Sequence, residues 1–211
     1  MVPSLQCAAL QPSRVTYCTA ITTEGKESHW QESLLIFENL QEATLRSNVV
    51  TFGAAIGACE RGSLWQQSVY LLRRLQSERL EANVVVGSAA ISACAKCGQW
   101  ELVLQMLADL LGRCIEANVM TYTAAISSCE SAAKWPEAMQ LLVNMQESRL
   151  EANVITCSAV IACCPWEWAL QLLKESEDAL IQADLVLYNT TLRACEESHQ
   201  QAAAVALCSS L

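Results

Sequence analysis

The chain has 211 residues, a net charge of −9 and a hydrophobic content of 53%. Its longest apolar run, near Ala202 to Cys208, falls well short of the roughly 18 to 20 residues that a membrane-spanning helix needs, so such a helix is excluded. Twelve cysteines would suit a small secreted disulfide scaffold, but their regular spacing along the chain argues against one.

The main feature of the sequence is a repeat with a spacing of 35 residues. Three residue types recur in register: Trp30, Trp65, Trp100 and Trp135; Ile21, Ile56, Ile91 and Ile126; and Asn48, Asn83, Asn118 and Asn153. The segment RLEANV also occurs twice, at 79–84 and at 149–154. Self-similarity at a period of this length is typical of solenoid proteins. The sequence therefore predicts one elongated array in which each repeat contacts its neighbours.

The repeats can be followed in chain order. Residues 1–13 resemble the end of a preceding repeat. Four full units follow, at 14–48, 49–83, 84–118 and 119–153. A shortened unit spans 154–184, and a sixth unit begins in 185–211. No signal or transit peptide is visible, because the first segment already looks like repeat sequence. We therefore expect the chain to be a fragment of a longer array.

Each full unit contains two helical patterns. In the first, Phe52, Ala55, Ile56 and Cys59 follow the i, i+3, i+4, i+7 spacing of an amphipathic helix. The second pattern begins at the tryptophan, as in the stripe Trp100, Val103, Leu104, Leu107 and Leu110. A polar or glycine-containing turn separates the two, so each unit is predicted to be a helical hairpin. Since one hairpin cannot bury its apolar face alone, the predicted fold is an all-α solenoid of stacked helix-turn-helix repeats with a concave surface.

The fifth unit differs from the others. Alignment of Trp166 with the other tryptophans places a four-residue deletion at Cys164 and Pro165. Four residues are about one helical turn, so the first helix is predicted to stop early, near Ala162, with a locally altered twist. A genuine deletion and an error in the gene model explain this feature equally well.

Five cysteines occupy one equivalent slot of the repeat: Cys59, Cys94, Cys129, Cys164 and Cys195. A free cysteine behaves as a small buried hydrophobic residue. One thiol per repeat has no partner nearby. We therefore expect buried thiols without disulfides, as in a reducing compartment.

The unit resembles the pentatricopeptide repeat (PPR). The resemblance is carried by Val119, Met120, Thr121, Tyr122, Thr123 and Ile126, by LVLYNTTL at 185–192, and by the closing Asn or Asp of each unit. Tetratricopeptide repeats have a period of 34 and a Gly and Tyr pattern that is absent here. The tryptophan that opens every second helix departs from the PPR pattern and is interpreted as a core wedge. The resemblance implies a right-handed superhelix.

The resemblance also implies binding of single-stranded RNA, one base per repeat. The family reads bases with the fifth and last residues of a repeat, while the second residue packs beside the base. Carried over, the reading pairs are Cys18 with Asn48, Gly53 with Asn83, Ser88 with Asn118, Thr123 with Asn153, and Ser158 with Asp184, with Asn189 as the fifth residue of the last unit; the packing residues are Val15, Val50, Val85, Met120 and Ile155. These pairs imply the preference A-A-G for units three to five, whereas Cys18 and Gly53 are not standard readers.

Local structural roles remain open for these polar residues. Each closing asparagine precedes a helix and can act as its N-cap. Ser88, Thr123 and Ser158, near a helix start, can likewise satisfy local backbone N–H groups. Both roles are compatible with base reading.

Cations recur in the thirteenth slot as Lys26, Arg61 and Lys96, but Ser131 follows in the fourth unit. By resemblance this slot lies near the RNA phosphates, and an exposed turn residue is the alternative. The net charge of −9 opposes RNA binding, since phosphate neutralisation supplies most of the affinity for nucleic acids. We therefore expect the acidic residues on the convex face and weak binding by the isolated chain.

The predicted function is sequence-selective RNA binding in organellar RNA processing, stability or editing. The chloroplast or mitochondrion is implied by resemblance alone. Protein partners that supply catalysis or basic surface are also expected, whereas a membrane or a small-molecule substrate is not. The alternative is a protein-binding scaffold that uses the same concave face.

An enzyme is not expected. The deaminase domains that some PPR proteins carry need H-x-E and P-C-x-x-C motifs, but neither His29 nor His199 is followed by x-Glu. The C-x-x-C from Cys94 to Cys97 lacks a second pair of ligands. The sequence therefore predicts no catalytic residue, no metal and no cofactor.

Overall fold

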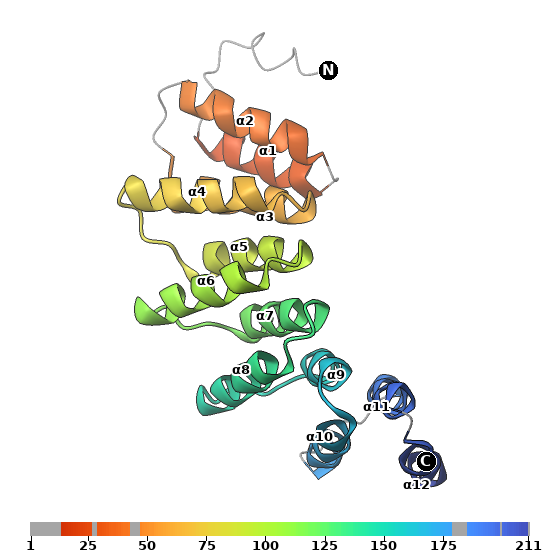
Figure 1. Ribbon diagram of the computed structural model, residues 1–211. Coiled ribbons are helices and arrows are strands. Elements are labelled where there is room, and N and C mark those ends of the chain that lie inside the picture. The colour runs from red at the N-terminus through yellow and green to blue at the C-terminus, as the bar shows by residue number, and fades with distance from the viewer. Residues whose placement is uncertain (1–13, 27–28, 43–46, 179–184, 199, 211) are drawn as a thin grey trace. The chain divides into compact units, whose positions relative to one another are not determined.

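A computed structural model of the chain describes residues 14–26, 29–42, 47–178, 185–198 and 200–210 (Figure 1). These residues form the helices α1 (Arg14–Lys26), α2 (Trp30–Glu42), α3 (Val49–Arg61), α4 (Trp65–Ser77), α5 (Val84–Lys96), α6 (Trp100–Gly112), α7 (Val119–Ser131), α8 (Trp135–Glu147), α9 (Val154–Cys163), α10 (Trp166–Asp178), α11 (Leu185–Glu197) and α12 (Gln201–Ser210). The prediction of an all-α fold built from helix-turn-helix repeats is confirmed.

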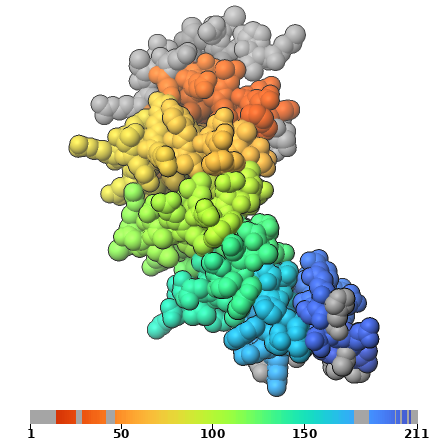
Figure 2. Space-filling view, in the orientation of Figure 1, coloured from red at the N-terminus to blue at the C-terminus, as the bar shows by residue number. Residues whose placement is uncertain are grey.

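The chain divides into two compact units, Met1–Cys97 and Gly98–Leu211, each of which is described by itself. In the N-terminal unit, α3 packs against α1, α2, α4 and α5. Figure 2 shows the yellow side chains of α3 and α4 directly against the orange ones of α1 and α2. In the C-terminal unit, α7 packs against α6, α8 and α9, and α9 packs against α10 and α11. Within each unit, therefore, first helices lie between those of neighbouring hairpins.

The apolar stripe predicted for the first helices forms the core of each unit. Phe52, Ala55, Ile56 and Cys59 of α3 are all fully buried. The Phe52 ring meets Phe37 of α2 edge-on, with ring centroids 5.2 Å apart. The prediction that one cysteine slot is buried is confirmed as well, because its members are at most 7% exposed.

The stripe predicted for the second helices needs a correction. In α6 the buried residues are Val103, Met106, Leu107 and Leu110, whereas Leu104 is only half-buried. The apolar face is therefore rotated slightly toward Met106, and Leu104 lies at its edge.

The tryptophans begin the second helices but are not core residues. A Cβ on Gly62, in the turn of the next hairpin, would lie 2.8 Å from the Trp30 ring. The Lys134 ammonium lies 5.0 Å from the centre of the Trp100 ring, a cation–π distance. Trp135 is 36% exposed. The interpretation as a core wedge is therefore corrected for Trp30 and Trp100: both rings are half-buried and contact the turn of the following hairpin.

The shortened hairpin ends its first helix early. Helix α9 has 10 residues against 13 in α7, and it ends at Cys163, one residue beyond the predicted Ala162. The Pro165 carbonyl then accepts the backbone N–H of Trp168 and of Ala169, each at 3.0 Å. Helix α10 thus starts without an intervening turn.

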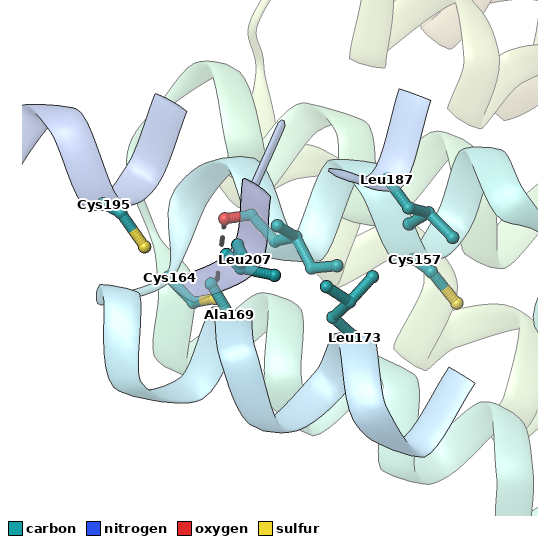
Figure 3. Packing of buried hydrophobic residues seen from close by; sticks show 8 residues of the cluster. Cys157, Cys164, Ala169, Leu173, Leu187, Cys195 and Leu207 are labelled. Atoms are coloured by element: carbon teal, nitrogen blue, oxygen red, sulfur yellow. Dashed lines mark hydrogen bonds between the residues drawn. The ribbon is translucent and has the colours of Figure 1, made fainter. Parts of the chain in front are cut away.

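One hydrophobic cluster joins this hairpin to the next. Figure 3 shows it, and its buried members come from four helices and the α9 end: Cys157, Ile161, Cys164, Ala169, Leu173, Leu187, Cys195 and Leu207. The Cys164 thiol donates to the Ile161 carbonyl at 3.6 Å. Burial raises the pKa of Cys164 to about 11. The shortened turn is therefore accommodated by a dry, closely packed core.

The described part of the chain contains no helix that is both long and apolar enough to span a bilayer.

Candidate functional site

The second residue of each repeat is an exposed apolar side chain. Exposure is 70% for Val15, 65% for Val50, 68% for Val85, 69% for Met120 and 64% for Ile155. The neighbouring third residue of α3, α5, α7 and α9 is buried in each case. The first turn of these helices thus exposes an aliphatic side chain at the protein surface.

In the N-terminal unit, five predicted site residues line one hollow of about 440 Å³. Val50, Gly53, Asn83 and Val85 all line it, together with Arg61. The rest of its lining combines small and apolar residues with one acid: Thr22, Val49, Ala54, Gly57, Glu60, Val86 and Ala89. A Cβ on Gly53 would lie 3.3 Å from a Val86 methyl, so glycine keeps this space open. The hollow therefore joins the second, fifth and last slots of the repeat.

The closing asparagines cap the following helices. In each case the asparagine Oδ1 accepts the backbone N–H of the residue three positions later. The pairs are Asn48 with Thr51 at 2.9 Å, Asn83 with Val86 at 3.0 Å, Asn118 with Thr121 at 2.9 Å, and Asn153 with Thr156 at 2.8 Å. The capping role is thus confirmed. Because a backbone N–H can only donate, Oδ1 must face the helix, and Nδ2 faces away from the cap with both its protons. A cap and a reader can therefore be the same residue.

The fifth residues differ in what they contact. Ser88 donates to the Val85 carbonyl at 3.1 Å and Ser158 to the Ile155 carbonyl at 2.9 Å, so these hydroxyls bond local carbonyls and not the backbone N–H groups that were expected. Thr123 contacts the Val119 carbonyl at 2.8 Å and also the Thr156 hydroxyl at 2.7 Å.

Only some of the remaining predicted RNA-binding residues lie among the described residues. Cys18 is half-buried on α1, and Asn189 is exposed on α11. Asp184 lies outside the described residues, as does the side chain of Lys26. Ser88 and Asn118 belong to different units, and each is placed only within its own.

The thirteenth-slot cations bind the end of the preceding first helix. Arg61 Nε donates to the Gly25 carbonyl. Lys96 Nζ lies 3.1 Å from Glu60 Oε1 and 3.5 Å from the Glu60 carbonyl. Cations are favoured at a helix C-terminus, where carbonyls lack intrahelical partners. These side chains thus link neighbouring hairpins, and their contact with phosphate stays a prediction.

Family profiles match the middle of the sequence. The pentatricopeptide repeat domain matches residues 105–165, and the PPR repeat matches residues 88–115. The chain contains pentatricopeptide repeats. No curated protein matches the sequence.

Solved structures of PPR proteins share its fold. The maize protein PPR10 is 21% identical with a TM-score of 0.76 over 95% of this chain and 30% of that one. The complex of PPR10 with an 18-nt psaJ RNA element is also 21% identical, with a TM-score of 0.69. That match covers 96% of this chain and 28% of PPR10. The PPR domain of Arabidopsis thaliana protein-only RNase P 1 in complex with tRNA is 10% identical, with a TM-score of 0.64. The match covers 90% of this chain and 96% of that one. This chain thus spans about 30% of the length of maize PPR10.

Sequence reasoning missed the third residue of the PPR unit. Thr121 Oγ1 donates to Asn118 Oδ1 at 2.8 Å, and Thr156 Oγ1 donates to Asn153 Oδ1 at 2.9 Å. The signal was available, because Asn-x-x-Thr at a helix start resembles a capping box.

One group of side chains in the described part of the PPR array has the spacing of metal ligands. Atoms of Glu24, His29 and Glu32 lie within 4.8 Å of one another. His29 Nδ1 is 3.5 Å from Glu24 Oε2, as in an ion pair. Imidazole and carboxylate groups can bind zinc, but Glu24 on α1 and Glu32 on α2 are half-buried and His29 between them is exposed; we assign no metal to this group.

Proposed function

We propose that the chain binds single-stranded RNA through the first helices of its repeats, with one base per hairpin. The observation that carries the proposal is the hollow of about 440 Å³ lined by Val50, Gly53, Asn83 and Val85. The resemblance to the PPR family implied these four residues, and they come from two successive hairpins. Their convergence on one concave space supports a base-binding role.

The chemistry of the hollow suits a planar base. Val50 and Val85 offer exposed aliphatic surface against which the flat face of a base can pack by dispersion. Asn83 anchors Oδ1 on its cap and keeps two N–H donors for the base edge. Single-stranded RNA is recognised in this way, because its unpaired bases expose both face and edge.

The solved relatives support RNA as the ligand class, since maize PPR10 was crystallised with an RNA element and the Arabidopsis PPR domain with tRNA. On this basis we infer a role in organellar RNA processing, stability or editing, in the chloroplast or the mitochondrion. The chain itself is non-catalytic in this proposal. Its partners supply catalysis or a basic surface that offsets the net charge of −9.

The test is fluorescence anisotropy with single-stranded RNA oligomers at two salt concentrations. Binding should weaken as salt rises, because bound phosphates release counterions, and duplex RNA of the same sequence should bind less well. Absence of salt-sensitive binding to any single strand would overturn the proposal.

Two charge-introducing variants locate the binding surface. The double variant Val50→Glu and Val85→Glu places carboxylates at the hollow and should weaken binding at least tenfold. Tyr70→Glu is the matched control, because Tyr70 is an equally exposed residue, at 61%, on the second helix α4. Equal effects of the two changes would exclude the first-helix surface as the binding site.

A protein-binding scaffold is the second candidate, and one observation favours it. A hollow of about 250 Å³ between α6 and α8 is lined by Leu104, Leu107, Leu111 and Leu141. It is smaller than typical small-molecule sites and fits one or two apolar side chains of a protein. Because it lies on second helices, Leu111→Glu should weaken protein binding and leave RNA binding unchanged.

A further inference from the structure

A chain of hydrogen bonds connects the two predicted readers of the hairpin 119–153. Thr123 Oγ1 lies 2.7 Å from Thr156 Oγ1, and Thr156 Oγ1 lies 2.9 Å from Asn153 Oδ1. Thr156 is fully buried, whereas Thr123 is half-buried and Asn153 is exposed. A buried hydroxyl thus bridges two side chains that reach the surface.

The direction of the protons in this chain follows from donor and acceptor chemistry. Asn153 Oδ1 accepts the Thr156 backbone N–H at 2.8 Å, so this amide atom is the oxygen and can only accept. Thr156 must therefore donate its single hydroxyl proton to Asn153. The 2.7 Å contact between the two hydroxyls then needs a proton from Thr123.

The Val119 carbonyl, 2.8 Å from Thr123 Oγ1, is the other acceptor for that proton. With either acceptor, the Thr123 proton points into the protein. Toward a ligand, Thr123 Oγ1 therefore offers lone pairs, while Asn153 Nδ2 offers protons. The hairpin displays an acceptor beside a donor.

We propose that Thr156 is a positioning residue that fixes this acceptor–donor polarity, so that the hairpin 119–153 selects bases with an amino group next to an unprotonated ring nitrogen. Adenine and cytosine present that edge. Guanine and uracil present the reverse, a keto oxygen next to a ring N–H, and a base held in the same orientation would then leave the protein's donor and acceptor mismatched. The inference rests on the proposed RNA binding and adds a specificity-determining residue outside the reading pair.

The chain itself provides two comparisons at the third slot. After Asn83 the slot holds Val86, which shows that valine fits this helix position. After Asn48 it holds Thr51, which is also buried but donates to the Asn48 backbone carbonyl at 2.7 Å, not to the side chain. Thr51 therefore caps its helix without polarising the asparagine amide through its hydroxyl.

The experiment measures base discrimination with the variants Thr156→Val, Thr156→Ser and Thr51→Val. RNA oligomers that differ at one base are titrated, and the position read by the hairpin is the one whose preference changes in Asn153→Asp. Thr156→Val should lower the ratio of amino-base to keto-base affinity at that position at least fivefold, with mean affinity within about twofold. Thr156→Ser, which keeps the hydroxyl, should restore the ratio, and Thr51→Val should not change it there. An unchanged ratio in Thr156→Val would overturn the inference.

A measurement without RNA separates this inference from the proposed function. In the free protein, NMR should detect a slowly exchanging Thr156 hydroxyl proton and shifted Asn153 amide resonances, both altered in Thr156→Val. If no single strand binds but these signals are present, the RNA-binding proposal fails and the polarised pair stands. If RNA binds and the signals are absent, the role of Thr156 is overturned while RNA binding stands.

Discussion

The hairpins 49–83 and 119–153 have the same helical architecture but present different surfaces. Both have two helices of 13 residues, begin after an asparagine cap, and bury isoleucine and cysteine at equivalent slots. At the fifth slot, however, Gly53 leaves an open hollow, whereas Thr123 joins a hydrogen-bonded chain. The comparison teaches that the core and capping residues maintain the hairpin. The fifth residue of a repeat and the third residue of the next repeat can change without altering that hairpin.

The two hairpins also differ in how they contact the preceding one. At the fourteenth slot Gly62 lies under the Trp30 ring, while the equivalent residue is Ala132. At the thirteenth slot Arg61 reaches back to the Gly25 carbonyl, while Ser131 donates within its own helix to the Ser128 carbonyl at 2.9 Å. The effect of a substitution in one hairpin can therefore be compared with a substitution at the equivalent position of the other.

The largest effect is expected from Gly62→Ala. Its new Cβ would lie 2.8 Å from the Trp30 ring, so the ring must shift, at a cost of about 1–3 kcal/mol in the free energy of unfolding. Urea denaturation measures it. The matched change Ala132→Gly should cost no more than about 1 kcal/mol, and equal costs would show that Trp30 does not pack tightly on this turn.

The next effect is a loss of stability in alkali. Burial raises the pKa of Cys59 from 9.0 to about 12, so above pH 9 the unfolded chain loses the thiol proton while the folded chain keeps it. The free energy of unfolding should then fall by about 1.4 kcal/mol per pH unit for this thiol, up to its folded pKa. Cys59→Ala should flatten the fall measured by urea denaturation between pH 9 and 11.

Cys114→Ala is the control for the loss of a cysteine side chain, because Cys114 is exposed and its replacement takes no thiol from the core. At the slot equivalent to Cys59, burial first and then the Glu137 charge raise the pKa of Cys129. Cys129→Ala should therefore also flatten the curve. A slope that neither buried-site variant alters would contradict the assignment to these thiols.

A smaller effect separates the two caps. Asn83→Ala removes one capping bond and should cost about 1 kcal/mol. Asn153→Ala removes the same bond and also leaves the buried Thr156 hydroxyl without its acceptor, which should add about 1 kcal/mol. Urea denaturation of both variants gives the difference. In a Thr156→Val background the extra cost should disappear, and its persistence would contradict the hydroxyl chain.

The sequence was sufficient to predict the helices, because the 35-residue period repeats the same evidence several times. Phe52, Ile56 and Cys59 were correctly predicted to be buried. The end of α9 was predicted within one residue, since a four-residue deletion leaves little room for alternatives.

The contacts between hairpins could not be predicted. The tryptophans were interpreted as core residues because periodic aromatics usually are, but Trp30 packs on the turn of the following hairpin. Whether a side chain enters a core or a neighbouring turn depends on the offset between stacked hairpins, which no residue pattern encodes. For the same reason the partners of Arg61 and Thr156 appear only in three dimensions.

The smallest effect concerns Arg61, and it distinguishes a link between hairpins from a phosphate contact. Arg61→Met removes the bond to the Gly25 carbonyl, and because the side chain is exposed the stability cost should stay below about 1 kcal/mol. If Arg61 also binds phosphate, the slope of log K against log salt for single-stranded RNA should shrink by about 0.7. Ser131→Lys should steepen that slope by a similar amount, because it adds the missing cation at the equivalent slot. An unchanged slope in both variants, with reduced stability in Arg61→Met alone, would assign the thirteenth slot to hairpin stacking and remove it from the RNA-binding surface.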